Sequence, residues 1–207
     1  MIRSARFAAM ILSLTPLLNA ADTPDKLLGR WRSLETSKGG IGAMLDFHAD
    51  GTVDFSPGGI VESQYRIEGN ALIMKTADQS INRMTWELVS ENSLHLKPAA
   101  GKAGQPAFVE LTREATRQSA DEPLTGEWIE KRSMAGQNLQ AHWIFRSPDK
   151  LLFLLPFTTQ PGHYTVTGDS IRLSLPNRPL LEGKFRIDGE VLKLPARQTP
   201  DTPYARY

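Results

Sequence analysis

The sequence predicts an all-β protein of two small antiparallel β-barrels in tandem, each about 90 residues long. The motif Gly29-Arg30-Trp31 returns as Gly126-Glu127-Trp128 at the head of the second half. Short alternating apolar segments and turns follow each motif in the same order, and the halves end near Arg113 and Arg206. These parallels indicate an internal duplication. The alternative is a single β-sandwich with regularly spaced turns.

The N-terminal segment 1–21 has the pattern of a cleaved signal peptide. Arg3 and Arg6 precede a short apolar run, and small residues surround Ala20. The run is shorter than the roughly 20 apolar residues of a transmembrane helix, so we expect no membrane span. We therefore expect an exported protein, periplasmic or secreted.

The remaining chain divides at a polar stretch without periodicity, residues 114–123, which we expect to be a linker. The expected domains are a first barrel over 22–113 and a second over 124–207.

Charge and cysteine content exclude several classes of protein. The formal net charge is +1, and loss of Arg3 and Arg6 with the signal peptide changes it to 1 − 2 = −1. A nearly neutral chain lacks the basic surface that nucleic acid or anionic lipid requires. The chain has no cysteine, which excludes disulfides, thiolate metal sites, a cysteine nucleophile and a lipid-modified cysteine.

Alternating residues identify the expected strands. In the first half, Leu45 and Phe47 point to one side before the Asp50-Gly51 hairpin turn, and Val53 and Phe55 resume that side after it. Further hairpins follow, for about eight short strands in the first half. The second half repeats the order, with bulky inward residues that would fill much of each narrow barrel.

Gly-x-Trp in the first strand, a series of hairpins and an arginine at the end of the last strand resemble the lipocalin-like (calycin) superfamily. The resemblance implies an up-and-down barrel in which the arginine lies across the tryptophan ring and locks the closed end. It places this lock at Trp31 and Arg113 in the first half, and at Trp128 and Arg206 in the second. Each half is shorter than a lipocalin with a ligand cavity, so the resemblance implies the fold more than the binding of a ligand.

The sequence shows no catalytic or metal-binding motif, and we expect no cofactor. The four histidines are His48, His95, His142 and His163, and none has the i, i+2 or i, i+4 spacing of paired metal ligands.

One apolar segment exceeds the needs of a half-buried strand. In 151–157, alternation sends Leu151, Phe153 and Leu155 into the barrel and leaves Leu152 and Leu154 outside. Either the other half packs on this face, or the face binds a partner protein, lipid or apolar ligand, or the strand is buried on both sides. If the face is an interface, aspartates at 152 and 154 should abolish binding or packing between halves without unfolding the second half.

We therefore expect a non-catalytic binding or interaction protein for a small apolar ligand or an envelope protein. The binding residues would be Leu152, Leu154 and Phe157. One alternative is a small β-barrel enzyme of isomerase or hydrolase type, with polar residues meeting at a barrel mouth: Asp54, Glu62, His142 or His163. Another is a structural envelope component. The sequence leaves the oligomeric state open.

Overall fold

The computed structural model describes residues 24–99, 107–114, 122–134, 136–195 and 201–207. The expected signal peptide, 1–21, and most of the expected linker lie outside these residues. Strands hold 68% of the residues, which confirms the all-β prediction.

The described elements are one short helix and 16 strands joined in one antiparallel sheet. The helix is α1 (Pro24–Leu27). The strands encoded before the expected linker are β1 (Gly29–Ser33), β2 (Ile41–Phe47), β3 (Thr52–Glu68), β4 (Ala71–Thr76), β5 (Ile81–Ser90), β6 (Ser93–Pro98) and β7 (Val109–Arg113). Those encoded after it are β8 (Gly126–Met134), β9 (Gln137–Arg146), β10 (Lys150–Pro156), β11 (Gln160–Thr167), β12 (Ser170–Ser174), β13 (Leu181–Lys184), β14 (Arg186–Asp188), β15 (Val191–Leu194) and β16 (Thr202–Arg206).

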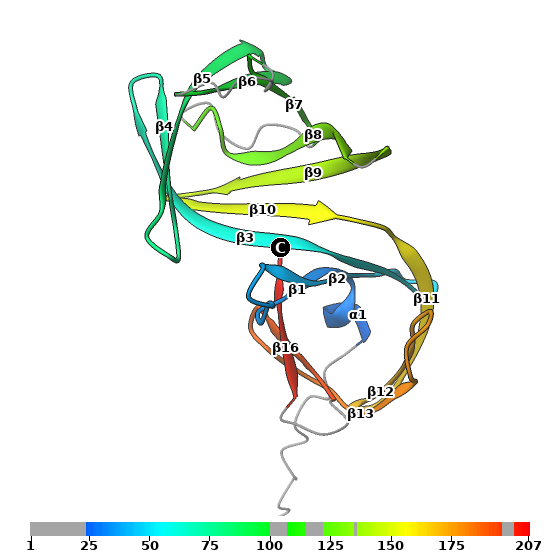
Figure 1. The fold of residues 1–207 in the computed structure, drawn as a ribbon. Coiled ribbons are helices and arrows are strands. Elements are labelled where there is room, and N and C mark those ends of the chain that lie inside the picture. The colour runs from blue at the N-terminus through cyan, green and yellow to red at the C-terminus, as the bar shows by residue number, and fades with distance from the viewer. Residues whose placement is uncertain (1–23, 100–106, 115–121, 135, 196–200) are drawn as a thin grey trace, which may run out of the picture.

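Eight consecutive strands, β3 to β10, form a closed antiparallel barrel. Each strand pairs with the next, and β10 pairs back onto β3, with Leu154 opposite Ile60. This arrangement, the upper lobe in Figure 1, confirms the prediction of a small antiparallel β-barrel. A closed barrel leaves no unpaired edge.

The other strands and the first part of β3 form a second curved region of the same hydrogen-bonded sheet, the lower lobe in Figure 1, which is called the second sheet below. β11 pairs with β3, β3 with β2, β2 with β1, and β1 with the C-terminal β16. Beyond β11, the sheet continues through β12 to β13. Beyond β16, it continues through β15 to β14. Only Phe185 separates β13 from β14 in the sequence, so the two ends of this path are joined by the polypeptide chain itself.

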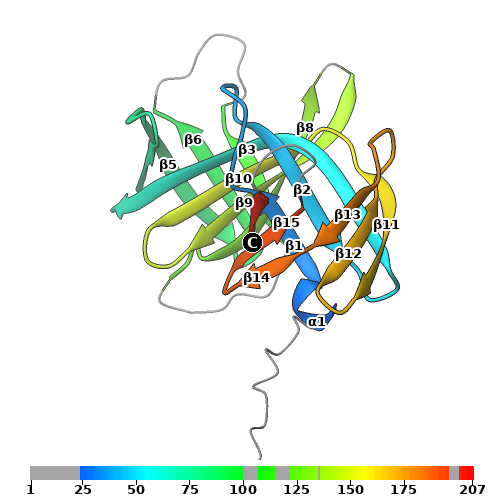
Figure 2. The ribbon, with the colours of Figure 1, turned by 90° about the horizontal axis from the view of Figure 1, so that it is seen from below.

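β3 belongs to both lobes and crosses the whole molecule, as Figure 2 shows from below. Its 17 residues combine what the hydrophobic pattern suggests are two separate short strands, one around Phe55 and one around Tyr65. The junction of the two parts contains Gly58, where an added Cβ would lie 2.2 Å from the carbonyl oxygen of Leu155. Glycine is therefore required here, because β10 approaches β3 more closely than any side chain allows.

Each lobe has its own hydrophobic core around one tryptophan. Trp31 and Trp128 are fully buried, and each indole Nε1 donates a hydrogen bond of 2.8 Å to a carbonyl four residues earlier, of Leu27 and Leu124 respectively. The other buried residues of the second sheet's core are Leu45, Phe47, Val53, Phe55, Tyr164, Ile171, Leu173, Phe185, Leu192 and Leu194. Those of the closed barrel are Tyr65, Leu72, Met74, Leu94, Leu96, Leu111, Trp143, Phe145 and Leu151.

The arginine–tryptophan locks exist, but their expected pairing is wrong. The guanidinium of Arg113 lies 3.9 Å from the ring centre of Trp128, and that of Arg206 lies 4.2 Å from the ring centre of Trp31. Each arginine therefore locks the tryptophan of the other half. The cause is the crossing at β3, which leaves β1 and β2 in the lobe that the C-terminal strands complete. Each lobe takes strands from both 22–113 and 124–207, so the lobes do not coincide with these two ranges.

Among the described residues, no helix has the length and hydrophobicity that a membrane-spanning helix requires.

Candidate functional site

The apolar face of β10 lies between the two lobes. Leu152 and Leu154 are 7% and 1% exposed, and they pack with Met44, Ile60 and Ile144. These side chains are therefore not available to an external partner in this arrangement. Phe157 lies apart from them, half-buried against another group of buried residues: Leu139, Ala141 and Leu155.

A partly buried ion pair connects the lobes beside this apolar face. Arg30 donates two hydrogen bonds, of 2.8 and 2.6 Å, to the carboxylate oxygens of Glu127. His142 Nδ1 lies 2.7 Å from Oε1 of the same carboxylate, which must accept the bond because it is ionised. Arg30 and Glu127 hold the middle position of the two Gly-x-Trp motifs, so the repeated motifs meet across the junction through opposite charges.

The C-terminal residue completes this junction. Figure 1 marks the C-terminal end between the lobes, beside β1 and β3. The Tyr207 ring lies 5.0 Å from the guanidinium of Arg30, and its backbone N–H bonds to the Arg30 carbonyl. Burial raises the pKa of the Tyr207 hydroxyl to about 12. Tyr207 is therefore packed as a neutral aromatic ring over the ion pair.

The pKa of Glu127 shows how strongly its partners hold it. Burial alone would raise this pKa and is the largest single influence, but hydrogen bonds from Arg30 and His142, with their charges, outweigh it and lower the pKa from 4.5 to about 2. A group whose pKa is lower in the folded state stabilises the fold above its unfolded value. Stability from Glu127 is thus present above pH 4.5 and lost as the pH falls towards 2.

We expect Glu127→Gln to remove this pH dependence. The shift from 4.5 to about 2 corresponds to about 3 kcal/mol at neutral pH, of which about 2 kcal/mol is lost by pH 3. Urea unfolding at pH 7 and pH 3 measures the free energy of unfolding of both proteins. The native chain should be more stable than the variant at pH 7, and this difference should be smaller at pH 3. Glu182→Gln, which removes an exposed carboxylate paired with Arg172, is the matched control and should show no such change. An advantage independent of pH would contradict the assignment.

The polar residues considered for an enzyme lie in separate contacts. Asp54 lies 3.2 Å from His48, Glu62 forms an ion pair with Arg32, and His142 binds Glu127. The fourth, His163 on β11, lies opposite Thr52 and Ser174 in the strand register. Across the part of the chain that the structure describes, no three His, Cys, Asp or Glu side chains are grouped to hold a metal ion.

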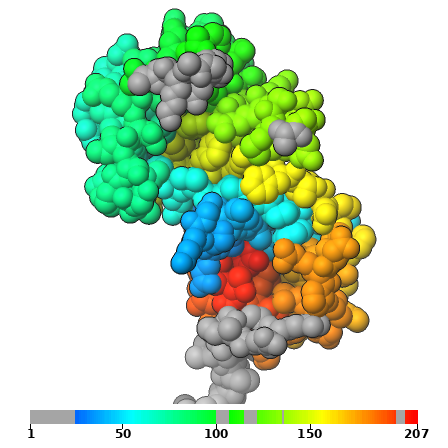
Figure 3. Space-filling model, in the orientation of Figure 1, coloured from blue at the N-terminus to red at the C-terminus, as the bar shows by residue number. Residues whose placement is uncertain are grey.

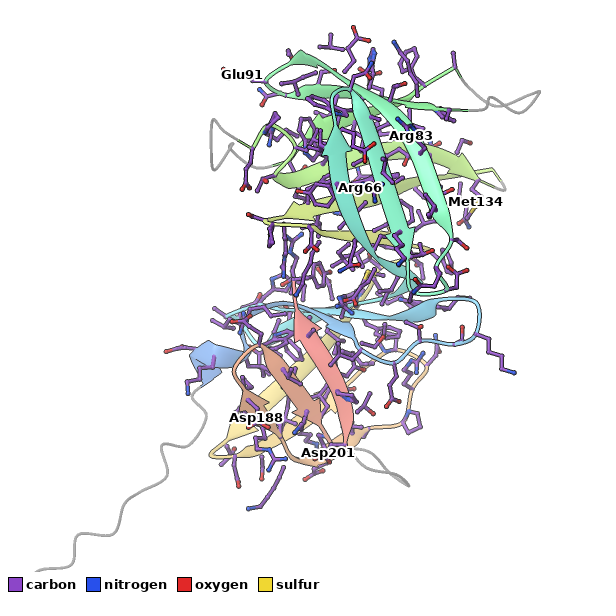
Figure 4. The ribbon with its side chains drawn as sticks, turned by 90° about the vertical axis from the view of Figure 1, so that its left-hand side faces the viewer. Arg66, Arg83, Glu91, Met134, Asp188 and Asp201 are labelled. Atoms are coloured by element: carbon purple, nitrogen blue, oxygen red, sulfur yellow. The ribbon has the colours of Figure 1, made fainter. Side chains whose placement is uncertain are left out.

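The second sheet has an apolar pocket of about 290 Å³ at the end remote from α1. Along β2, Phe47 lies near the α1 end, Leu45 lies opposite Trp31, and Ala43 lies at the pocket. Figure 4 shows α1 at one end of this sheet and Asp201, the neighbour of Thr202 in the pocket wall, away from it. The pocket is lined by Ala43, Leu45, Phe55, Leu173, Leu175, Arg178, Pro179, Leu181, Leu194, Pro195, Thr202 and Tyr204.

Three polar side chains lie in this apolar wall: Arg178, Tyr204 and Thr202. The Arg178 guanidinium lies 4.6 Å from the ring centre of Phe55. Burial raises the pKa of the Tyr204 hydroxyl, and the positive charge of Arg178 acts in the opposite direction. A cation and a buried hydroxyl are therefore close enough to interact at one side of an apolar pocket, an arrangement suited to an acidic group attached to an apolar body.

The chain matches no protein-family model, no curated protein and no solved structure.

Sequence analysis did not identify Arg178 or the Arg30–Glu127 pair. Arg178 follows a strand in a Pro-Asn-Arg-Pro stretch, which signals a turn and carries no motif for binding. The sequence does contain a pattern that indicates the ion pair: the middle residue of the Gly-x-Trp motif is Arg30 in the first copy and Glu127 in the second, and these side chains carry opposite charges.

Proposed function

We propose that this chain is an exported, non-catalytic binding protein that takes a small apolar ligand with an acidic group into the pocket of the second sheet. The observation that carries the proposal is Arg178 in a wall otherwise made mainly of apolar side chains. The ligand's apolar part would lie against Leu45, Phe55 and Leu173, and its acidic group would face Arg178 and Tyr204. The signal-like segment 1–21 supports export.

The pocket is chemically suited to this class of ligand. Its volume of about 290 Å³ is close to the lower end of the range for small-molecule sites, so the ligand must be small. Apolar lining favours burial of hydrocarbon in proportion to the area removed from water. A guanidinium gives the site a preference for anionic over neutral or cationic head groups.

We further propose that the two lobes are duplicated, lipocalin-like barrels that have exchanged strands. The local structure at the two tryptophans supports this. Gly29 and Gly126 both have positive φ angles, +102° and +121°, and at each an added Cβ would lie 3.1 Å from an arginine Nη1. The same glycine, indole and guanidinium arrangement thus recurs in both lobes, as expected if one ancestral unit was copied and β3 came to bridge the copies.

We expect Arg178→Met to weaken the binding of octanoate, a short apolar carboxylate, about tenfold, because a charge-assisted hydrogen bond contributes about 1.5–3 kcal/mol before solvent exposure reduces it. Isothermal titration calorimetry measures the affinity, with octanol and octylamine as comparison ligands. The native protein should prefer octanoate to both, and the variant should lose this preference.

Two further variants complete the test of the pocket. Arg172→Met removes an arginine from the exposed face of the same sheet and should leave octanoate binding unchanged. Ala43→Phe fills the pocket wall and should reduce the binding of all three ligands, with circular dichroism confirming the fold. Equal affinity for the three ligands in the native protein would count against the role of Arg178, and binding insensitive to Ala43→Phe would place the ligand elsewhere.

A further inference from the structure

A larger groove of about 540 Å³ lies at the junction of the two lobes, separate from the apolar pocket. One wall belongs to the closed barrel and contains the tip of the β4–β5 hairpin and the β9–β10 turn. The opposite wall belongs to β1, β16 and the β14–β15 turn of the second sheet. In Figure 3 the outline of the molecule narrows between the two lobes at this level.

The groove is strongly cationic in a chain that is nearly neutral overall. Its basic side chains are Arg32, Lys75, Arg146, Lys150 and Arg206, and its acidic side chains are Glu62 and Glu190. Five basic and two acidic groups leave a formal excess of three positive charges. Such a concentration of one sign in a concave surface attracts anions.

Two of these cations are already engaged. Arg206 stacks on Trp31, bonds to the carbonyls of Lys26 and Leu28, and lies 3.6 Å from Glu190. Its role is to lock the second sheet.

Arg32, the most buried cation of the groove, pairs with Glu62, whose side chain is 59% exposed. Burial lowers the pKa of Arg32, and the positive charge of Arg146 lowers it further. The groove therefore brings the guanidiniums of Arg32 and Arg146 close together, and the carboxylate paired with Arg32, that of Glu62, is largely exposed to solvent.

The remaining cations have no acidic partner among the residues that the structure describes. Within the described ranges, Lys75, Arg146 and Lys150 form no ion pair. Two carboxylates next in sequence to groove residues have other partners: Asp78 accepts hydrogen bonds from Thr76 and Ser80, and Asp149 accepts one of 3.4 Å from Gln64.

We propose that this groove binds a compact polyanion with charge on two groups, such as a diphosphate or a dicarboxylate. Arg146 and Lys150 from the closed barrel would hold one group, and Arg32 from the second sheet would hold the other. Neutral donors in the wall, Ser63 and Gln64, would add hydrogen bonds. A bound polyanion would therefore connect the two lobes across their junction.

The experiment is isothermal titration calorimetry with sodium pyrophosphate and, in a second arm, sodium succinate, at an ionic strength kept constant with sodium chloride. The native protein should bind at least one of the two probes saturably. The double variant Arg146→Ala, Lys150→Ala should weaken this binding at least tenfold, because two of the charge-assisted contacts are lost. The arm that binds more tightly identifies the chemistry as phosphate or carboxylate.

Two control variants separate the groove from general charge effects. Arg83→Ala removes an exposed arginine that Figure 4 labels on the closed barrel away from the junction, and it should leave binding unchanged. Glu62→Gln should tighten binding about threefold, because it frees Arg32 from its exposed partner. Arg178→Met should have no effect, since the apolar pocket is independent of the groove. Absence of binding in both arms, or equal losses in Arg83→Ala and the double variant, would overturn the proposal.

Discussion

Cysteines introduced at Arg32 and Ala205 are expected to form a disulfide that joins the two ends of the chain. The two residues face each other across β1 and β16, and paired antiparallel residues have Cα atoms at the separation that a disulfide needs. The protein has no cysteine of its own, so no competing disulfide can form. The closed loop spans most of the chain, and an entropic model assigns such a loop about 5 kcal/mol of stabilisation, an upper limit for an engineered bridge.

The matched control tests the crossed arrangement directly. If each half closed on itself, with Arg113 over Trp31, the residue opposite Arg32 would be Thr112. Cysteines at Arg32 and Thr112 should therefore remain free thiols in the folded protein, whereas the 32/205 pair should be oxidised and should raise the urea midpoint. Thiol titration and non-reducing electrophoresis distinguish the two. Oxidation of the 32/112 pair in the monomer would refute the exchange of strands.

Leu154→Asp is expected to cause the largest loss of stability of any single substitution considered, about 4 kcal/mol or more. Leu154 is 1% exposed among apolar side chains from both lobes, and a carboxylate placed there has neither water nor a partner. Such a loss is a large part of the 5–15 kcal/mol that stabilises a typical domain. Because β3 is shared, both lobes should unfold in the same transition. Urea unfolding followed by tryptophan fluorescence measures this, with Trp31 reporting on the second sheet and Trp86, Trp128 and Trp143 on the closed barrel.

Two variants calibrate this loss. Leu154→Ala should cost about 2–5 kcal/mol through the cavity that it leaves. Val89→Asp places the same carboxylate at a strand residue that is 55% exposed, and it should change stability by less than about 1 kcal/mol. The pattern in the sequence favours a different outcome, in which aspartates at 152 and 154 detach the halves without unfolding the second. A stable Leu154→Asp chain would support that outcome and contradict the shared core.

Local pattern predicted much of the secondary structure. Alternation placed Leu45, Phe47, Val53 and Phe55 on one inward face, and the Asp50-Gly51 turn lies between β2 and β3 as expected. These features depend on residues close in sequence, where side-chain period and turn chemistry decide the conformation.

Which strands close each ring could not be predicted. Arg113 and Arg206 are equivalent in the repeat, and either could satisfy either tryptophan with the same contacts. The choice depends on whether β3 turns back or continues across the junction. The apolar pocket was missed for a related reason: its wall combines Phe55 from the first half with Arg178 and Tyr204 from the second.

The pairing of β1 with β16 has a consequence for biosynthesis. β1 is synthesised long before its partner β16, so this lobe cannot close until β16 has left the ribosome. Contacts between such distant segments require closure of a very long loop, which slows folding and leaves strand edges open to aggregation. During this delay β1 has an unpaired edge, which a holding chaperone could cover until β16 arrives.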